Sequence, residues 1–376
     1  MKVLHFYKTY YPDSFGGVEQ TIFQLASGLG SFGVDATVLA LTQNHTDREI
    51  EVNGHKVFRS RSNFKLASTD FSFSVFWQFK ELVEEVDIVH YHFPWPFMDL
   101  LHLILNNKKP SLVTYHSDIV KQKYLLKLYK PLRNKFLKNI DAIVATSPNY
   151  LVTSDVLRLY QSKVEVIPIG LDKELYPKIS VELSRYWKNI VGEKFFLFIG
   201  VLRYYKGLNI LLDALAICNF PTVIIGSGPI ENELKAKATL LGISNIIFLG
   251  QLSDNDKVVI LDLSYSLIFP SHLRSEAFGI SLLEGAMFGK PMISSEIGTG
   301  TSFINIDQET GIIVAPSSSI ELHLAMKFLW DNPEIALKMG LKALERYLKI
   351  FTADKMCQSY ATLYQRLIDE NLDPPK

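Results

Sequence analysis

The chain has 376 residues, and its 39 Lys and Arg residues balance 39 Asp and Glu residues. This length predicts two domains, because a domain ordinarily contains about 100–200 residues. Apolar residues make up 48% of the chain, which excludes a disordered protein, and the zero net charge argues against a dedicated nucleic-acid-binding protein. The two cysteines, Cys218 and Cys357, stand far apart, which excludes a disulfide framework or a zinc ribbon and indicates a reducing compartment.

Neither a signal peptide nor a membrane-spanning segment is apparent in the sequence. The apolar run at the N-terminus is short and is interrupted by Lys8 and Pro12. No window approaches the roughly 18 apolar residues that a spanning helix needs. We therefore expect a cytoplasmic protein, for which attachment to a membrane surface stays open.

Short β-branched runs alternate with longer amphipathic stretches through the first half of the chain. The expected strands are Lys2–Tyr7, Val34–Leu41, Asp87–Tyr91, Ser111–Tyr115, Asp141–Thr146 and Val164–Pro168. A Gly-Gly loop and a helical pattern over Val18–Leu29 follow the first of them. Continuous apolar strands that alternate with helices predict a parallel sheet covered on both faces, and this set ends near Asp172.

The same pattern restarts after a polar stretch around residues 175–193. The expected strands are Phe195–Val201, Thr222–Ile225, Ile246–Leu249, Leu267–Phe269 and Pro291–Ser294, separated by helices that include Phe278–Phe288. The closing helices are expected near Ser319–Trp330, Pro333–Ile350 and Ala353–Glu370. The prediction is an α/β protein with two Rossmann-like domains. Ligands of such sheets bind outside the carboxyl ends of the strands, so domains that face one another would enclose a cleft.

Two loops that follow predicted strands have the composition of phosphate-binding turns. Gly16 and Gly17 precede a helix, where backbone N–H groups and the helix dipole favour an anion, although a tight turn explains the pair equally well. The segment GVLRYYKG at residues 200–207 places two cations before the next helix. Arg203 could bind phosphate oxygens bidentately and Lys206 would act as a point charge, whereas the simpler alternative is a solvated basic loop.

The most specific pattern is a pair of glutamates, Glu276 and Glu284, separated by seven residues. Both are expected on or beside one helix, within about 80–100° of the same face. Carboxylates accept paired hydrogen bonds from vicinal diols, so the two could hold two sugar rings. The backbone N–H groups of Phe278, Gly279 and Ile280 would hold a phosphate between them. Alternatively, Glu276 is a helix-start acid and Glu284 a surface residue, although the apolar neighbours of Glu284 disfavour full exposure.

In this order, these three features resemble the retaining GT-B glycosyltransferases of glycosyltransferase family 4, and the resemblance covers essentially the whole chain. Further family-like segments are VIPIGLD (166–172), IIGSGPIENELK (224–235), LIFPS (267–271) and TGIIVAP (310–316). Residues 294–305 look most like bacterial O-antigen and capsule mannosyltransferases. The resemblance implies an acceptor-side domain at residues 1–172, a nucleotide-sugar-binding domain at 173–352, and a last helix at 353–376 that packs back on the first domain.

The resemblance also implies roles for single residues. Lys206 and Arg203 would neutralise the leaving diphosphate, and Glu276 and His116 would lie at the transferred sugar; these four are the catalytic candidates. The donor-binding candidates are Gly16, Gly17, Gly226, Leu252, Phe278, Gly279, Ile280 and Glu284, the last of them on the ribose diol. The family often has Arg directly after the first glycine of the basic motif, where this chain has Val201 and its arginine two residues later.

These implied roles describe a retaining transferase that moves a hexose, mannose from GDP-mannose, onto a lipid-linked O-antigen or capsule intermediate. Two cations and a helix N-terminus can stabilise a leaving diphosphate as a divalent metal does elsewhere, so neither a metal nor another cofactor is expected. The alternatives are a UDP-hexose donor, a UDP-sugar epimerase, and a non-catalytic nucleotide-sugar-binding scaffold.

Residues 119–140 carry seven cations and no acid. The cations are Lys121, Lys123, Lys127, Lys130, Arg133, Lys135 and Lys138, interleaved with leucine and aromatic residues. A basic amphipathic helix of this kind favours an anionic membrane surface or a diphosphate-lipid acceptor, whereas a solvated face is the simpler alternative. Asp118, Lys121 and Lys123 are the acceptor-side candidates, and the expected location is cytoplasmic, at the inner face of the bacterial plasma membrane.

Two patterns that suggest metal binding have simpler explanations. Asp254-Asn255-Asp256 spells the metal motif of another glycosyltransferase architecture, but it follows Ser253 at a helix start, where capping is expected. His90 and His92 alternate on one strand and point the same way, but a metal centre needs a third ligand that the sequence does not place.

Overall fold

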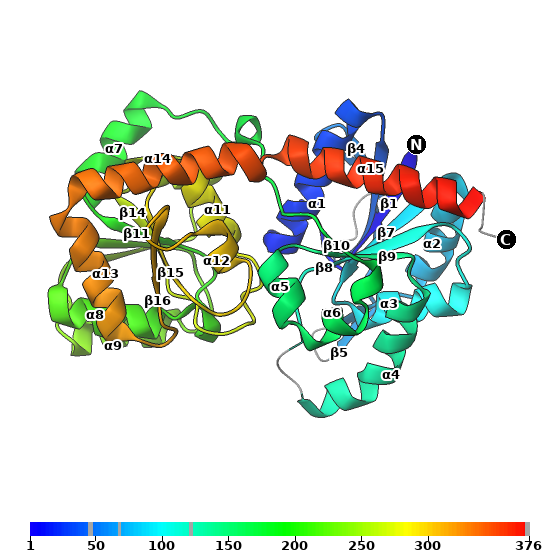
Figure 1. Cartoon of the computed structure of the whole chain (residues 1–376), viewed down its shortest axis with the longest axis horizontal. Coiled ribbons are helices and arrows are strands. Elements are labelled where there is room, and N and C mark those ends of the chain that lie inside the picture. Colours follow the sequence, from blue (N-terminus) through cyan, green and yellow to red (C-terminus); the bar gives the residue numbers. More distant parts are fainter. Residues whose placement is uncertain (44–47, 67–68, 120–122, 373–376) are drawn as a thin grey trace. The chain divides into compact units, whose positions relative to one another are not determined.

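The computed structural model describes residues 1–43, 48–66, 69–119 and 123–372 (Figure 1). The chain divides into two compact units: Met1–Leu171 together with Thr352–Lys376 form the first, and Asp172–Phe351 form the second. Each unit is built around its own sheet of largely parallel strands with helices packed against it. Within the described residues, no helix combines the length and the apolar character that crossing a bilayer requires.

The first unit contains an eight-stranded sheet in the order β10-β9-β8-β7-β1-β2-β4-β3. Its strands are β1 (Lys2–Phe6), β2 (Asp35–Thr42), β3 (Glu49–Val52), β4 (His55–Arg61), β7 (Ile88–Phe93), β8 (Ser111–Tyr115), β9 (Ala142–Ala145) and β10 (Val164–Val166). All neighbouring pairs are parallel except β3 and β4, which are antiparallel. The α/β prediction is therefore confirmed for this half of the chain.

The sequence interpretation misses the β3–β4 hairpin and a small two-stranded ribbon, β5 (Phe64–Leu66) with β6 (Thr69–Phe71). The hairpin turn consists of Asn53 and Gly54, whose φ angles are 45° and 82°. Asn-Gly at such a turn is the strongest short-range hairpin signal, since both residues tolerate positive φ. The Asn-Gly pair is therefore a local sequence signal for this hairpin.

The first unit contains α-helices and short 3-10 helices. They are α1 (Gly17–Gly28), η1 (Leu29–Phe32), α2 (Ser74–Glu85), α3 (Pro96–Leu105), α4 (Lys123–Asn139), α5 (Pro148–Thr153), α6 (Asp155–Leu159), η2 (Gln161–Lys163) and α15 (Ala353–Leu372). The last helix packs against α1 and η1 (Figure 1). Its buried tyrosines Tyr360 and Tyr364 reach the sheet, where their hydroxyl groups hydrogen-bond to Thr114 (2.7 Å) and His90 (2.6 Å). The C-terminal helix is thus a structural part of the N-terminal unit.

The second unit contains a six-stranded, fully parallel sheet in the order β13-β12-β11-β14-β15-β16. Its strands are β11 (Phe196–Ile199), β12 (Thr222–Ile225), β13 (Ile246–Gly250), β14 (Ser266–Phe269), β15 (Met292–Ser295) and β16 (Gly311–Val314). The sequence interpretation contains all of these strands except β16. Numbered within the unit, the order is 3-2-1-4-5-6, which is the doubly wound order of nucleotide-binding sheets.

The second unit likewise contains α-helices and short 3-10 helices. They are η3 (Lys173–Leu175), α7 (Val181–Val191), η4 (Tyr204–Lys206), α8 (Leu208–Cys218), α9 (Glu231–Leu240), α10 (Asp254–Leu263), α11 (Ile280–Met287), α12 (Thr301–Ile304), α13 (Ser319–Asp331) and α14 (Pro333–Ile350). Leu211, Leu215 and Met326 belong to one large buried cluster that joins α8 and α13 to the central strands. This core holds the strand ends, and therefore the loops that follow them, in fixed positions.

Candidate active site

Lys206 and Glu276 lie in two loops that leave the sheet of the second unit at a switch point. The direction of strand connection reverses between β11 and β14, and ligands of doubly wound sheets bind at such a point. The loop after β11 carries Lys206 in η4, and the loop after β14 carries Glu276. Two motifs that lie 70 residues apart in the sequence are therefore brought together.

Lys206 and Glu276 form an ion pair, with the Lys206 Nζ 2.5 Å from the Glu276 Oε2. Both side chains are largely buried, with 12% and 11% of their surface exposed. The Ser271 hydroxyl donates to the same carboxylate oxygen at 3.2 Å, and the Lys206 Nζ lies 4.9 Å from the centroid of the Phe269 ring. A cation that is largely shielded from water interacts more strongly with a nearby anion than an exposed cation does.

Glycines bring the loop after β12 against the loop after β11. A Cβ atom on Gly226 would lie 2.0 Å from the carbonyl oxygen of Gly200, and one on Gly228 would lie 2.4 Å from that of Leu202. The Leu202 N–H donates to the Ser227 carbonyl oxygen at 2.9 Å. Gly226, predicted to contact the donor, therefore has a packing role as well, because it lets the two loops pack directly against each other.

Two other candidates of this unit come from the same ends of the strands. Arg203 immediately precedes η4 and is exposed, as is Val201 two residues before it. Leu252 lies two residues after β13 and is half-buried. Both candidates follow strands at the carboxyl edge of the sheet, where the ligand of such a sheet binds.

The two glutamates do not share a helix. Helix α11 begins at Ile280, and its N-cap is Gly279 with φ of 103°; Glu276 lies in the preceding loop. The prediction of a helix from Phe278 and of a common helical face is wrong, because the left-handed conformation of Gly279 interrupts the helical path. Of the three residues whose N–H groups were predicted to hold a phosphate, Ile280 opens the helix, Gly279 caps it, and Phe278 precedes it, buried.

Glu284 lies within α11 and is almost completely buried, with 6% of its side chain exposed. Its Oε1 accepts a hydrogen bond from the Tyr176 hydroxyl at 3.0 Å and lies 3.3 Å from the Lys257 Nζ. Burial alone would lower the pKa of Lys257, but Glu284 and Asp254 outweigh it and raise the pKa above its usual value. The expectation that Glu284 is not fully exposed is confirmed, and Tyr176 and Lys257 are site neighbours that the sequence interpretation misses.

The Asp-x-Asp segment forms the first turn of helix α10, which Ser253 caps, as predicted. The Ser253 hydroxyl accepts from the Asp256 N–H at 3.2 Å at the start of α10. The Asp256 carboxylate accepts from the indole N–H of Trp187 at 2.8 Å, and the Asp254 carboxylate pairs with Lys257 at 3.0 Å. Protein groups therefore engage both carboxylates.

In the first unit, Gly16 caps helix α1 and Gly17 begins it. Glu19, in the first turn of α1, is buried and accepts hydrogen bonds from the hydroxyls of Thr9 and Ser14, each at 2.8 Å. A Cβ atom on Gly16 would lie 2.5 Å from a carboxylate oxygen of Glu19. Glu19 therefore ties the glycine loop to the helix, and an acid three residues after an N-cap is a signal that the sequence offered.

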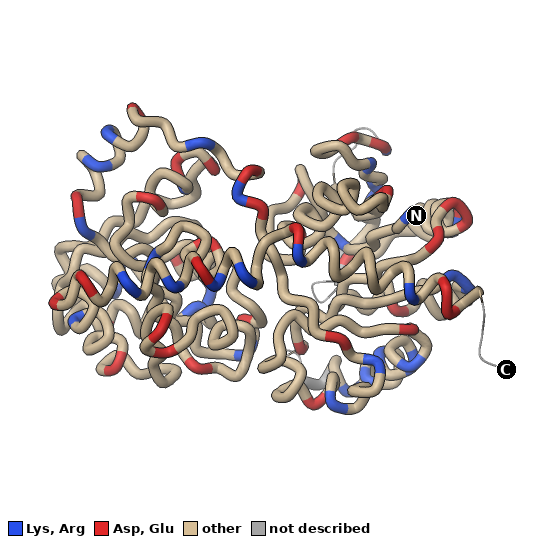
Figure 2. The backbone as a smooth tube through the Cα atoms, turned by 45° about the horizontal axis from the view of Figure 1, so that its top comes forward, with Lys and Arg blue, Asp and Glu red and all other residues tan. Residues whose placement is uncertain are grey.

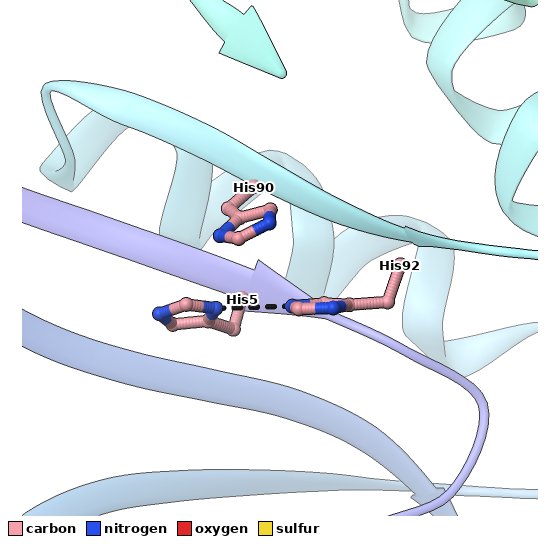
Figure 3. A group of neighbouring side chains, drawn as sticks. All are labelled: His5, His90 and His92. Atoms are coloured by element: carbon pink, nitrogen blue, oxygen red, sulfur yellow. Dashed lines mark hydrogen bonds between the residues drawn. The ribbon is translucent and has the colours of Figure 1, made fainter. Parts of the chain in front are cut away.

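His116 directly follows β8 and is buried. Its Nε2 lies 3.0 Å from the Nδ1 of His92, whose Nε2 lies 3.1 Å from the Nδ1 of His5. His5 lies on β1, opposite His90 on β7, so it is the third histidine that the sequence could not place beside His90 and His92 (Figure 3). Burial lowers the pKa of His116 to about 3, so its imidazole is neutral at physiological pH.

The acceptor-side candidates follow His116. Asp118 accepts hydrogen bonds from the hydroxyls of Tyr115 at 3.0 Å and Ser154 at 2.9 Å, which hold the loop after β8 in place. Lys121 lies outside the described residues. Lys123 is the first residue of α4, and its side chain is not among those described.

Helix α4 presents cations and apolar side chains to the surface. Its exposed lysines are Lys127, Lys130, Lys135 and Lys138. Leu128 is 80% and Leu125 48% exposed on the same helix, and Figure 2 shows cationic segments recurring along it. Arg133, by contrast, is buried and donates to the Asn134 side chain at 2.9 Å, so its inclusion in a basic exposed face is wrong.

Two doubly wound units in one chain are the architecture of the GT-B glycosyltransferases. Sucrose-phosphate synthase from Thermosynechococcus elongatus has the same fold, with a TM-score of 0.79 at 20% identity, over 98% of this chain and 99% of that one. Residues 15–175 match the family model described as Glycosyltransferase Family 4, and residues 182–346 match the one described as Glycosyl transferases group 1. The chain belongs to glycosyltransferase family 4 and is a glycosyltransferase.

Two curated relatives are similar over nearly their full length. D-rhamnosyltransferase WbpZ of Pseudomonas aeruginosa is 57% identical over 94% of this chain and 93% of its own. O-antigen chain mannosyltransferase C of Escherichia coli is 47% identical over 98% of this chain and 99% of its own. These similarities confirm the family expected from the sequence, including its likeness to O-antigen mannosyltransferases.

Proposed function

We propose that this protein transfers mannose from GDP-mannose, with retention, onto a lipid-linked intermediate of O-antigen or capsule. The names of both relatives support a sugar of manno configuration, because D-rhamnose is 6-deoxymannose. The single observation that carries the donor site is the Lys206–Glu276 pair at the switch point of the second sheet. A cation beside a carboxylate suits a ligand that presents a diphosphate next to sugar hydroxyls.

In the proposed reaction the bond from the anomeric carbon to the diphosphate breaks, and a bond to the acceptor oxygen forms on the same face of the sugar. The acceptor proton passes to the leaving phosphate oxygen. Lys206 and Arg203 stabilise the charge that develops on the diphosphate, together with the N-terminus of α11, so no metal is assigned a role. Glu276 binds hydroxyls of the transferred sugar, which carries oxocarbenium character in the transition state.

The remaining candidates bind and orient the donor. Glu284 is proposed to accept hydrogen bonds from the ribose diol through its Oε2, because its contacts with Tyr176 and Lys257 both use Oε1 and no other described residue forms a hydrogen bond or ion pair with the carboxylate. Gly16 and Gly17 are proposed to contact the diphosphate through backbone N–H groups. His116 is proposed to hydrogen-bond to the transferred sugar.

We further propose that α4 docks the protein on the anionic inner face of the bacterial plasma membrane, where the lipid-linked acceptor resides. Exposed lysines next to Leu125 and Leu128 support this proposal. Each lysine near an anionic surface contributes about 1 kcal/mol, and the leucines add apolar burial.

The second candidate donor is GDP-D-rhamnose, which the 57% identity to a D-rhamnosyltransferase favours. D-rhamnose differs from mannose only in lacking the 6-hydroxyl group, so the reaction type would be the same. A pocket that hydrogen-bonds the 6-hydroxyl would reject the deoxy sugar strongly, whereas an apolar pocket would discriminate little.

The test is a thermal-shift screen of GDP-mannose, GDP-D-rhamnose and UDP-hexoses, followed by turnover of the best donor with and without EDTA and by linkage analysis of the product. We expect stabilisation by guanosine nucleotides, equal turnover in EDTA, and a retained anomeric configuration. A preference for uridine nucleotides would overturn the donor assignment. Binding of a nucleotide sugar without turnover on any lipid-linked acceptor would favour a scaffold.

A further inference from the structure

A chain of ring-to-ring hydrogen bonds runs through the interior of the first unit to His116. His5 lies on β1, His92 on β7, and His116 at the end of β8, on neighbouring parallel strands. The links measure 3.1 Å from the Nδ1 of His5 to the Nε2 of His92, and 3.0 Å from the Nδ1 of His92 to the Nε2 of His116. Figure 3 shows the first link, with the ring of His90 beside it.

The same region offers the ligand count of a metal centre, since ring nitrogens of His5, His90 and His92 lie within 4.8 Å of one another. The facing nitrogens of His5 and His92 are only 3.1 Å apart, which leaves no room between them for an ion that binds each at about 2.0–2.1 Å. The rings of His90 and His92 are stacked, with centroids 4.3 Å apart and planes 26° apart, so their in-plane lone pairs do not converge.

His90 is also engaged by other groups. Its Nδ1 lies 2.6 Å from the hydroxyl of Tyr364, and its Nε2 lies 2.7 Å from that of Thr114. Both ring nitrogens of His90 therefore have protein partners. The geometry favours a hydrogen-bonded chain of His5, His92 and His116 over a metal centre.

The inner end of the chain decides which nitrogens carry protons. The Nε2 of His5 is buried and has no hydrogen-bond partner within the described part of the chain. Buried N–H groups without an acceptor are rare in proteins, so the proton of His5 belongs on its Nδ1, from which it donates to His92. His92 then donates from its own Nδ1 to the Nε2 of His116. His116 must in turn carry its proton on Nδ1.

We propose that His5 and His92 are positioning residues that hold His116 in the Nδ1–H tautomer, so that it offers the transferred sugar a hydrogen-bond donor rather than a base. This inference rests on the proposed function, in which His116 contacts the sugar. None of the described residues is recorded as a partner of the His116 Nδ1, so this N–H can donate to a sugar oxygen. Burial lowers the pKa values of His5 and His116 to about 3, which keeps both rings neutral.

The test uses the full-length protein labelled with ¹⁵N at histidine, because protonated and unprotonated ring nitrogens have well separated NMR shifts. Signals are assigned by single substitutions. We expect His5, His92 and His116 to be Nδ1–H tautomers in the wild type. In His5→Leu, which removes the ring farthest from His116, we expect a mixture of tautomers at His116.

In the same variant, kcat should fall about three- to tenfold while the KM for the donor stays within twofold, because one hydrogen bond at the sugar is weakened. His5→Asn, whose amide can donate in place of Nδ1, should restore both the tautomer and most of kcat. His102→Gln is the matched control, because His102 is a buried histidine of the same unit that bonds to Tyr91 and lies outside the chain. It should leave the His116 signals unchanged.

An Nε2–H tautomer of His116 in the wild type, or unchanged His116 signals in His5→Leu, would overturn the proposal. Tight zinc binding that shifts the signals of His5, His90 and His92 would overturn it as well. If His5→Leu does not fold, the tautomer of His116 in the wild type still tests the proposal. A wild type inactive with every nucleotide sugar would refute the proposed function and leave the tautomer result standing, so the two failures are distinguishable.

Discussion

The ammonium group of Lys206 lies 2.5 Å from a carboxylate oxygen of Glu276, so the two residues proposed to act at either side of the scissile bond share one buried ion pair. A donor diphosphate would compete with Glu276 for the Lys206 charge. Removal of one partner leaves the other buried and unpaired, which is strongly unfavourable. The effect of a single substitution at this pair therefore combines the loss of that residue's own role with the cost of leaving its partner unpaired.

Replacing Lys206 by Ala should lower kcat by about 10²–10³-fold, because a fixed donor aimed at developing transition-state charge is lost. Initial rates at saturating donor measure the effect, with circular dichroism to check folding. Lys237→Ala is the matched control, since Lys237 pairs with Asp213 at the surface of the same unit. Near-wild-type turnover in Lys206→Ala would contradict the proposed role.

The buried Glu284–Lys257 pair should show energetic coupling. Glu284→Gln and Lys257→Met should each destabilise the protein, and the double variant should lose about 1–3 kcal/mol less than the sum, because it leaves no unpaired charge. Urea unfolding of the four proteins measures this coupling. Glu284→Gln should also raise the donor KM, because a neutral amide binds a diol less well than a carboxylate. Additive losses would show that the contact is energetically unimportant.

Gly228→Ala should destabilise the protein by about 1–3 kcal/mol and raise the donor KM, because its Cβ would lie 2.4 Å from the Leu202 carbonyl oxygen and would displace the loop that carries Arg203. Thermal or urea unfolding and donor titration provide the two readouts. Gly30→Ala is the matched control, because a Cβ there meets nothing within 4 Å. Equal stability of the two variants would show that the loop at Leu202 can move aside at little energetic cost.

Acid should destabilise the fold well above the pH of ordinary carboxylate titration. Burial lowers the pKa values of His5 and His116 to about 3 and those of His90 and His92 well below 6.5. Between pH 6.5 and about 3 the unfolded chain binds protons that the folded chain does not, so the free energy of unfolding falls as the pH falls. Each histidine contributes a slope of up to about 1.4 kcal/mol per pH unit.

Asp99 opposes this trend, because burial raises its pKa to about 8 and the folded chain keeps its proton. The stabilisation that Asp99 contributes is complete below the usual carboxyl pKa and is lost as the pH rises to about 8. Between these pH values it therefore cancels the pH dependence of one histidine. Urea unfolding at pH 7.5, 6.5 and 5.5 should therefore show a loss of several kcal/mol over the acid half of this range. A constant free energy of unfolding between pH 6.5 and 5.5 would contradict the buried neutral state of the histidines.

Charge reversal on α4 should abolish binding to anionic vesicles in a flotation assay. The variant carries Glu at three exposed lysines, Lys127, Lys130 and Lys135. The matched control reverses three exposed lysines of α14 and thereby makes the same change in net charge: Lys338, Lys342 and Lys349. We expect the control to float with the vesicles and the α4 variant to remain in the dense fraction. Equal flotation of both variants would contradict the proposed docking surface.

The sequence predicts the buried parallel strands well, because such strands are continuous apolar runs; β8 and β12 match their expected bounds. It misses β3, whose residues Glu49–Val52 alternate charged and apolar side chains at the edge of the sheet. It also extends α11 through Gly279, since helical periodicity does not reveal the left-handed φ of that residue.

The sequence by itself determined the two-unit α/β class, the family, and which residues stand in the loops after β11 and β14, because these depend on local pattern and chain order. Only the tertiary structure decided the pairing of Lys206 with Glu276, the burial of Glu284 against Tyr176 and Lys257, and the place of His5 beside His92. These contacts join residues 70, 108, 27 and 87 positions apart. They depend on the strand order, which long-range packing selects and which no local pattern encodes.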